Sequence, residues 1–286
     1  MSLRINQNIA AMNSYRNLSV TDGQMSKSLE KLSSGFRINR AADDAAGLSI
    51  SEGLRSQVGG LKVAVRNAQD GVNVAQTADG ALNETTSILQ RMRDLAVQAS
   101  NSGSQDADAK AASNQEFQQL NSELTRIAGA TKFGGQALLD GSYNGTFQVG
   151  STAGETIAVD LSTTNAATTK LFGSSSVTGF DAVKLGTSAL DLTADASTAI
   201  TKVDDAIKGV SAARSYIGAT QNRFEHTINN INVAVENLTA SESAIRDTDM
   251  ASEMVSFTRS QILAQAGTSM LAQANSASQS VLKLLG

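Results

Sequence analysis

A seven-residue repeat of apolar residues runs through most of this chain and limits its fold more than any other feature. From Ile50 to Ala99 the apolar positions recur at alternating steps of four and three. This spacing places them along one narrow seam of an α-helix, as in a coiled coil. None of the 286 residues is Pro, so no residue forces a break in a helix. A helix from Leu48 to Ser100 would be about 80 Å long at 1.5 Å per residue, so we predict a rod.

The same periodicity predicts four further helices, two in the middle of the chain and one near each terminus. The polar stretch Asn101 to Asp108 interrupts the first rod, and a shorter helix resumes around Phe117 to Ile127. A second long helix is predicted from Ile200 to Ile245. Apolar stripes also run along both terminal segments. Their members are Leu18, Met25, Leu29 and Leu32 near the N-terminus, and Val255, Ile262, Met270 and Val281 near the C-terminus.

A small region between the helices carries β signals. Asn144-Gly145 stands between apolar pairs and predicts a two-residue hairpin turn. Ile157, Val159 and Leu161 alternate as in a strand. Residues 162–198 are dominated by Ser, Thr, Ala and Gly, which indicates an exposed surface excursion. The fold class is therefore mainly α, with long coiled-coil helical rods and a small β-hairpin region.

The terminal stripes are too weak to hold their helices in place alone. Ordering the backbone costs about 1–2 kcal/mol per residue, whereas burying a large apolar side chain returns about 1.5–3 kcal/mol. The C-terminal stripe also contains small residues, namely Ala266, Ala274 and Ala277. Even a pair of such helices leaves apolar surface on its outer sides unless other copies cover it. We therefore predict a self-assembling structural subunit, in which the eight stripe residues named above form the terminal assembly stripe.

Catalytic and metal chemistry lack their usual residues. The chain has no Cys, and its one His, His226, follows seam residue Phe224 by two positions, where a solvated helix flank is expected. Asp106-Ala107-Asp108 lacks the Gly and distal Glu of a calcium loop, and Asp43-Asp44 is explained by capping of the long helix. We predict no enzyme activity, no cofactor and no metal.

Charge and hydropathy also restrict the partners. The net charge of −4 gives no general attraction to nucleic acid. No segment approaches the roughly 20 apolar residues of a membrane span, and the first residues lack the apolar core of a secretory signal. On the rod, Arg91 and Leu95 point away from the seam, and an exposed Leu beside Arg suggests a contact surface.

Several long motifs resemble bacterial flagellin. The match starts with Lys31-Leu32-Ser33-Ser34-Gly35-Phe36-Arg37-Ile38-Asn39-Arg40 and continues to Ile50. It resumes at Ala75 to Leu82, Leu89 to Gln98, Phe147 to Gly150 and Ile262 to Asn275. Only residues 162–198 lack a counterpart, so the chain is similar to a short form without the large outer domains.

The resemblance implies a secreted subunit that polymerises into the extracellular flagellar filament for swimming motility. Its implied segments are coiled-coil arms of an inner tube (1–43 and 246–286), a helical rod with β-hairpins (44–165), a variable surface loop (166–198) and a returning rod helix (199–245). It also implies export unfolded through the flagellar type III apparatus, with an export chaperone, a filament cap protein and hook-associated proteins as partners.

One further partner is implied by the resemblance. Arg91, Leu95 and Glu116 match the segment read by the vertebrate flagellin-sensing Toll-like receptor, although the same face could make protofilament contacts. Two alternatives to the filament subunit stay open from the sequence: the flagellin-like protein at the hook–filament junction and the signalling rod of chemotaxis receptors. The latter would lack the hairpin and the strand-like Ile157 to Leu161.

Overall fold

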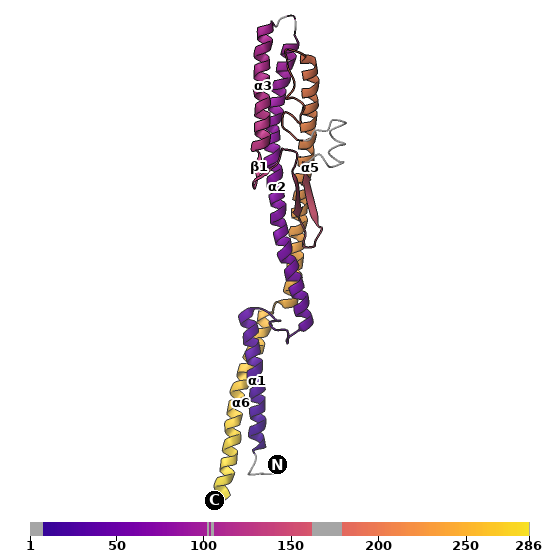
Figure 1. Cartoon of the computed structure of the whole chain (residues 1–286). Helices are drawn as coiled ribbons and strands as arrows, with labels where there is room; N and C mark the ends of the chain where they lie inside the picture. The colour runs from indigo at the N-terminus through magenta and orange to yellow at the C-terminus, as the bar shows by residue number, and fades with distance from the viewer. Residues whose placement is uncertain (1–7, 102, 104–105, 162–178, 286) are drawn as a thin grey trace. The chain divides into compact units, whose positions relative to one another are not determined.

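The computed structural model describes residues 8–101, 103, 106–161 and 179–285 (Figure 1). Its helices are α1 (Ile9–Ser34), α2 (Ala45–Ser100), α3 (Ala107–Ala130), α5 (Ala196–Arg246) and α6 (Met250–Leu285). Its strands are β1 (Lys132–Phe133), β2 (Gln136–Ala137), β3 (Asn144–Gln148) and β4 (Thr156–Asp160). The chain divides into two compact units, one of residues 1–57 with 236–286 and one of residues 58–235. The mainly helical fold and the predicted rods are confirmed.

The first unit is built on an antiparallel pair of helices, α1 and α6. The Asn8 side-chain amide donates to the Ala274 carbonyl at 3.0 Å, and Lys31 pairs with Glu253 at 3.7 Å near the other end. Asn8 also caps α1 by accepting from the Ala11 N–H, and Gly35 ends the helix in the left-handed conformation that glycine adopts without strain. The start of α1 and the last turns of α6 therefore lie at the same end of the pair (Figure 1).

The seam between α1 and α6 combines large residues with small ones. Half-buried positions recur at steps of three and four on both helices, and residue i of α1 faces residue 285 − i of α6, as for Leu18 and Gly267. The α1 members are Ala11, Ser14, Leu18, Thr21, Met25, Ser28 and Leu32. The α6 members are Glu253, Phe257, Ser260, Ala264, Gly267, Leu271 and Ala274. The register sets Met25 opposite Ser260 and Phe257 opposite Ser28, so a bulky side chain meets a small one and the helices pack closely.

A backbone joint connects the paired helices to α2 and α5 within this unit. The Arg37 N–H donates to the Arg246 carbonyl at 2.7 Å, and the Thr248 N–H donates to the Gly35 carbonyl at 3.0 Å. The Arg246 guanidinium lies 4.7 Å from the centre of the Phe36 ring and donates to Glu52 at 2.8 Å. These contacts join the segment that follows α1 to the segment between α5 and α6.

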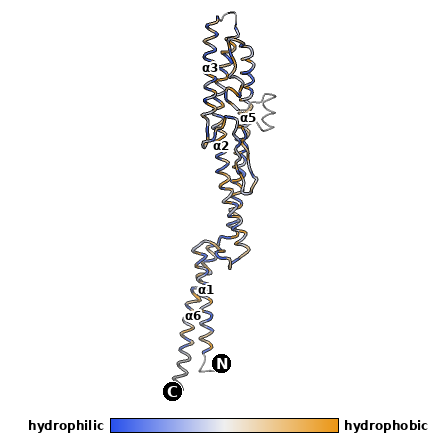
Figure 2. Tube along the Cα trace, viewed as in Figure 1, coloured by the Kyte–Doolittle hydropathy of each residue, from blue (hydrophilic) through white to orange (hydrophobic). Residues whose placement is uncertain are grey.

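In the second unit, α2 lies between α3 and α5 (Figure 1). Arg91 of α2 pairs with Glu116 of α3, and Arg93 of α2 pairs with Asp204 of α5. The core fills the space between the three helices, and its largest fully buried side chains include Phe117, Phe224, Leu89, Met92 and Ile217. Polar and apolar residues alternate along every helix (Figure 2). Among the described helices, none is long and apolar enough to cross a membrane.

The hairpins differ from the sequence prediction in one respect. Strand β4 carries the predicted alternation, with Ile157 and Val159 buried. It pairs antiparallel with β3 from Asn144↔Asp160 to Gln148↔Thr156, so Asn144-Gly145 lies within a strand and the predicted turn there is wrong. Gly145 is needed for packing instead, because a Cβ at this position would lie 2.4 Å from the Tyr143 hydroxyl. The two-residue turn occurs between β1 and β2, at Gly134-Gly135, where both φ angles are positive.

Residues 179–195, called the strap below, also differ from expectation. The prediction of an exposed excursion is wrong for this part, because Phe180, Leu185 and Leu192 are buried in the core. Three amide side chains of α3 hold the strap by its backbone. Asn114 accepts from the Leu192 N–H, Gln118 donates to the Leu190 carbonyl, and Asn121 donates to the Thr187 carbonyl. Residues 162–178, the rest of the predicted excursion, lie outside the described residues.

Candidate assembly surface

Large apolar side chains cover the outer sides of the α1/α6 pair, away from its seam. Each of them is between 48% and 67% exposed. On α1 they are Ile9, Met12, Tyr15, Val20 and Leu29; on α6 they are Met250, Met254, Val255, Ile262, Leu263 and Met270. Scattered single apolar residues are normal on a protein surface, but a row along each helix marks an interaction surface.

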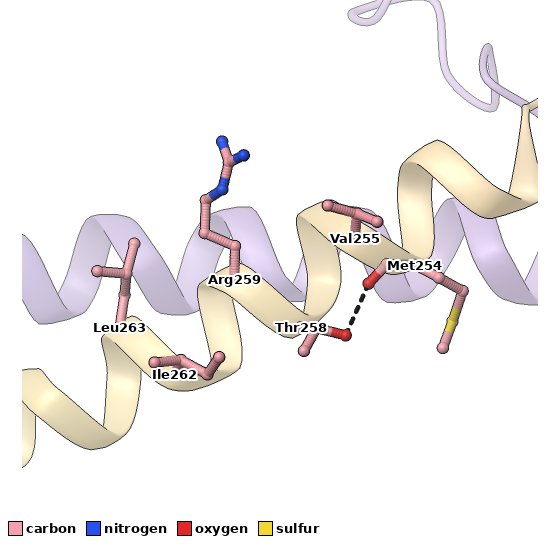
Figure 3. A pocket seen from close by; sticks show the side chains of 6 residues that line it. All are labelled: Met254, Val255, Thr258, Arg259, Ile262 and Leu263. Carbon is pink, nitrogen blue, oxygen red and sulfur yellow. Dashed lines mark hydrogen bonds between the residues drawn. The ribbon is translucent and has the colours of Figure 1, made fainter.

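A groove runs along the outer side of α6. Its lining consists of two rows of residues four apart, and we call this set the α6 face: Met254, Val255, Thr258, Arg259, Ile262 and Leu263 (Figure 3). The groove is open and has a volume of about 460 Å³. The Thr258 hydroxyl donates to the Met254 carbonyl at 2.8 Å and so satisfies its hydrogen-bonding need within the helix. Rows four residues apart are the ridges with which helices pack against one another.

A second groove, of about 570 Å³, lies on α1. It has the same spacing, and we call its α1 residues the α1 face: Ala11, Met12, Tyr15, Arg16, Ser19 and Val20. Leu271 of α6 closes one side of it. No ion pair joins Arg16 or Arg259 to an acidic side chain in the described part of the chain. Each face therefore offers an apolar surface and one free guanidinium.

The structure separates the predicted assembly stripe into two groups. Leu18, Met25 and Leu32 are half-buried in the α1/α6 seam, whereas Leu29, Val255, Ile262 and Met270 are exposed on the outer sides. The side chain of Val281 lies outside the described part. Val255, Ile262 and Met270 therefore lie outside the seam, and the role of the stripe in assembly stays a prediction. The seam positions of α6 include Ser260, Ala264 and Gly267, which a search for large apolar residues overlooks. A repeat of small residues at heptad spacing is the sequence signal that identifies this side of α6 as the one that packs against α1.

The predicted contact surface on α2 is also changed. Arg91 and Glu116 form an ion pair at 2.8 Å, and both side chains are about half-exposed. Leu95, however, is only 2% exposed and belongs to the core, so the prediction that it is exposed is wrong. Because α2 is covered by both α3 and α5, its buried stripe is wider than the single seam of a two-helix coiled coil.

Polar residues at the other predicted positions have local structural roles. Asp44 caps α2 by accepting from the Gly47 N–H at 2.9 Å. Asp43 accepts from the Arg40 and Asn39 N–H groups, and these hydrogen bonds, first that of Arg40, hold the pKa of its carboxyl below the ordinary value. His226 is exposed on α5, as predicted. Within the described ranges, no group of three or more His, Cys, Asp or Glu residues is placed to hold a metal ion.

Comparison with known proteins adds independent evidence. The family described as bacterial flagellin N-terminal helical region matches residues 5–144, and the bacterial flagellin C-terminal helical region matches residues 200–285. Flagellin of Halalkalibacterium halodurans is 50% identical over 98% of this chain and 99% of its own length. Flagellin of Bacillus subtilis is 47% identical over 99% and 100%. The flagellar filament 33 kDa core protein of Treponema phagedenis is 42% identical over 98% and 99%.

Proposed function

This chain belongs to the bacterial flagellin family and is a structural subunit of the flagellar filament, and we propose that it polymerises through the outer sides of the α1/α6 pair. Its length of 286 residues corresponds to a short form of the family. The relatives reported above are flagellins and a filament core protein, so neither the junction protein nor the signalling rod is favoured.

The observation that carries this proposal is the row of exposed apolar residues on each helix. Small residues fill much of the α1/α6 seam, whereas eleven large apolar side chains of the two helices are exposed on its outer sides. Burying one such side chain contributes about 1.5–3 kcal/mol. A contact between copies that covers several of them can therefore offset the entropy lost on association. Leu29, Val255, Ile262 and Met270 of the predicted stripe would be buried there, while Leu18, Met25 and Leu32 hold the pair together.

The location and partners of the chain follow from its family. We infer that it is secreted and works in the extracellular filament, where it serves swimming motility. An export chaperone, a filament cap protein and hook-associated proteins are its proposed partners. We infer no catalytic role, because the similar proteins reported above are flagellins and a filament core protein.

A second candidate role concerns Arg91 and Glu116. Their ion pair on the exposed side of α2 and α3 supports a proposed contact with the flagellin-sensing Toll-like receptor or with a neighbouring protofilament. Leu95 can act in it only by supporting α2 from the core. Arg91→Ala should weaken receptor signalling by monomer, whereas Arg126→Ala, which removes an exposed Arg paired within α3, should not. Equal signalling by the two variants would argue against the receptor contact.

The polymerisation proposal is tested with one charge on the outer side of α6. Ile262→Asp places a carboxylate at the centre of the proposed contact and should abolish filament formation, scored by electron microscopy after seeding. Val183→Asp is the matched control, because Val183 is 69% exposed, against 60% for Ile262, but lies on the strap. It should assemble normally. Both monomers should keep their helical content by circular dichroism. Normal filaments from Ile262→Asp would show that this side of α6 is not an assembly contact.

A further inference from the structure

Methionine is concentrated on the outer sides of the α1/α6 pair. Four of the seven Met residues are between 48% and 61% exposed, and we call this set the outer methionines: Met12, Met250, Met254 and Met270. Met25 is half-buried in the seam, and Met92 is fully buried in the core of the second unit. Every thioether that is largely exposed in the described part of the chain therefore lies on α1 or α6.

Each outer groove contains one of these thioethers. Met254 lines the groove on α6, where its side chain extends away from the helix (Figure 3). Met12 lines the groove on α1. Both grooves are open to solvent, so a small solute can reach the two sulfur atoms. Met is flexible and polarisable and is common on surfaces that bind other proteins.

The composition makes methionine the first target of a mild oxidant. The chain has no Cys, whose thiolate is otherwise the preferred site of oxidation. Hydrogen peroxide oxidises a thioether by two electrons to the sulfoxide. A sulfur lone pair forms a bond to one peroxide oxygen and the O–O bond breaks. The proton on the transferred oxygen passes to the departing hydroxide, which gives water.

We propose that the outer methionines are a reversible modification site, and that their oxidation to sulfoxide by hydrogen peroxide prevents the free subunit from polymerising. This inference rests on the proposed polymerisation through the outer sides of the pair. A sulfoxide is polar, and oxidation of this kind disrupts Met-rich interfaces. A contact between copies would have to remove the sulfoxide oxygen from water, and burying a polar group costs free energy unless a donor replaces the water. In its groove, Met254 lies beside the aliphatic side chains of Val255, Ile262 and Leu263.

Assembly protects the same sulfur atoms. When other copies cover the outer sides, peroxide reaches the outer methionines more slowly than it does in a free subunit. The modification therefore acts on subunits before they polymerise, and finished filaments resist it. Because methionine sulfoxide reductases convert the sulfoxide back to the thioether, the block is reversible.

Peroxide treatment of the free full-length chain tests the proposal. The outer methionines should be oxidised before Met25 and Met92, as followed by mass spectrometry of peptides. The critical concentration on seeds should rise at least about tenfold, because the apolar contribution of even one buried side chain corresponds to that ratio. Methionine sulfoxide reductase with a thiol reductant should restore the original value, which separates sulfoxide formation from other oxidative damage. The same dose applied to finished filaments should oxidise the outer methionines more slowly.

Leu variants provide the matched control, because Leu has a similar volume to Met and lacks the sulfur atom. Peroxide should not change the critical concentration of the fourfold variant that combines Met12→Leu, Met250→Leu, Met254→Leu and Met270→Leu. It should inhibit Met92→Leu, the same change in the core, as strongly as it inhibits the parent chain.

Three results would overturn the proposal. They are normal polymerisation of the parent chain with its outer methionines oxidised, equal inhibition of the parent chain and the fourfold variant, and no recovery after the sulfoxides have been reduced. The last of these is measured on the parent chain and does not depend on how the fourfold variant folds. Failure of the proposed polymerisation gives a different result, because untreated Ile262→Asp would then assemble normally.

Discussion

At the scale of single residues, Gly71 and Phe224 show how the core fixes one residue type in α2. A Cβ at position 71 would lie 2.5 Å from the Phe224 ring, which also packs edge-on against Phe147 with 5.6 Å between ring centres. Glycine is a poor helix former, so its use here reflects lack of space. The ring enters the gap that the missing side chain leaves.

Gly71→Ala should therefore destabilise the second unit despite the better helix propensity of Ala. Overpacking costs about 1–3 kcal/mol, and the gain in propensity offsets at most about 1 kcal/mol of it. Gly80→Ala is the matched control in the same helix, because nothing lies within 4 Å of its added Cβ. It should stabilise by up to about 1 kcal/mol. Urea unfolding monitored by circular dichroism measures both, and equal shifts in the two midpoints would contradict this explanation.

Asp43 makes the joint of the first unit sensitive to acid. Hydrogen bonds from the Arg40 and Asn39 N–H groups lower the pKa of its carboxyl in the folded chain. A lowered folded-state pKa gives stability that is present above the unfolded-state pKa and is lost as pH falls through the folded-state pKa. As pH falls below about 4, the ordinary pKa of an Asp carboxyl, the thermal stability of the chain should lose a contribution that Asp43→Asn does not lose. Asp22→Asn, an exposed change of the same charge on α1, should keep the acid sensitivity of the parent.

At the scale of elements, three amide side chains of α3 hold the strap by its backbone. Asn121 is buried, and its Nδ2 donates to the Thr187 carbonyl at 3.0 Å. Asn121→Ala leaves that buried carbonyl without its donor, which costs about 1–3 kcal/mol. Hydrogen exchange should accelerate in residues 179–195, while α2 and α5 keep their protection. Ser122→Ala, on the exposed side of α3, should leave the strap unchanged. Uniform acceleration across the unit would mean that the strap does not open by itself.

The helices could be predicted from the sequence, because each helix is specified by a repeat of apolar residues that lie close together along the chain. A heptad of Leu, Val and Ala sets the predicted Leu48–Ser100 rod, and α2 extends only three residues further at its N-terminus. The strap could not be predicted in this way. Its burial is decided by Asn114, Gln118 and Asn121, which lie some 70 residues earlier in the chain and look like an ordinary polar helix flank.

The candidate site was predictable in part for a related reason. Exposed apolar residues on the terminal helices were expected, and Val255, Ile262 and Met270 are indeed exposed. Which side of α6 faces α1 was not evident, because hydrophobicity alone does not rank Gly267 and Ala264 as packing positions. Leu95 was misplaced because a two-helix seam was assumed for a helix that contacts two neighbours.

At the scale of the whole molecule, charge opposes the assembly that the apolar faces favour. Each copy carries a net charge of −4, so copies repel one another at long range. Added salt shortens the Debye length from about 30 Å at 0.01 M to about 8 Å at 0.15 M and weakens this repulsion.

The critical concentration for polymerisation should therefore fall as NaCl rises over this range, as measured by sedimentation of seeded filaments. Arg66→Gln, an exposed change on α2, changes the net charge from −4 to −5 and should steepen the salt dependence. Asp70→Asn, an exposed change on the same helix, changes it to −3 and should flatten the salt dependence. A critical concentration that rises with salt would mean that attraction between charges drives assembly. Equal salt dependence in the two variants would show that the net charge of the subunit does not control its polymerisation.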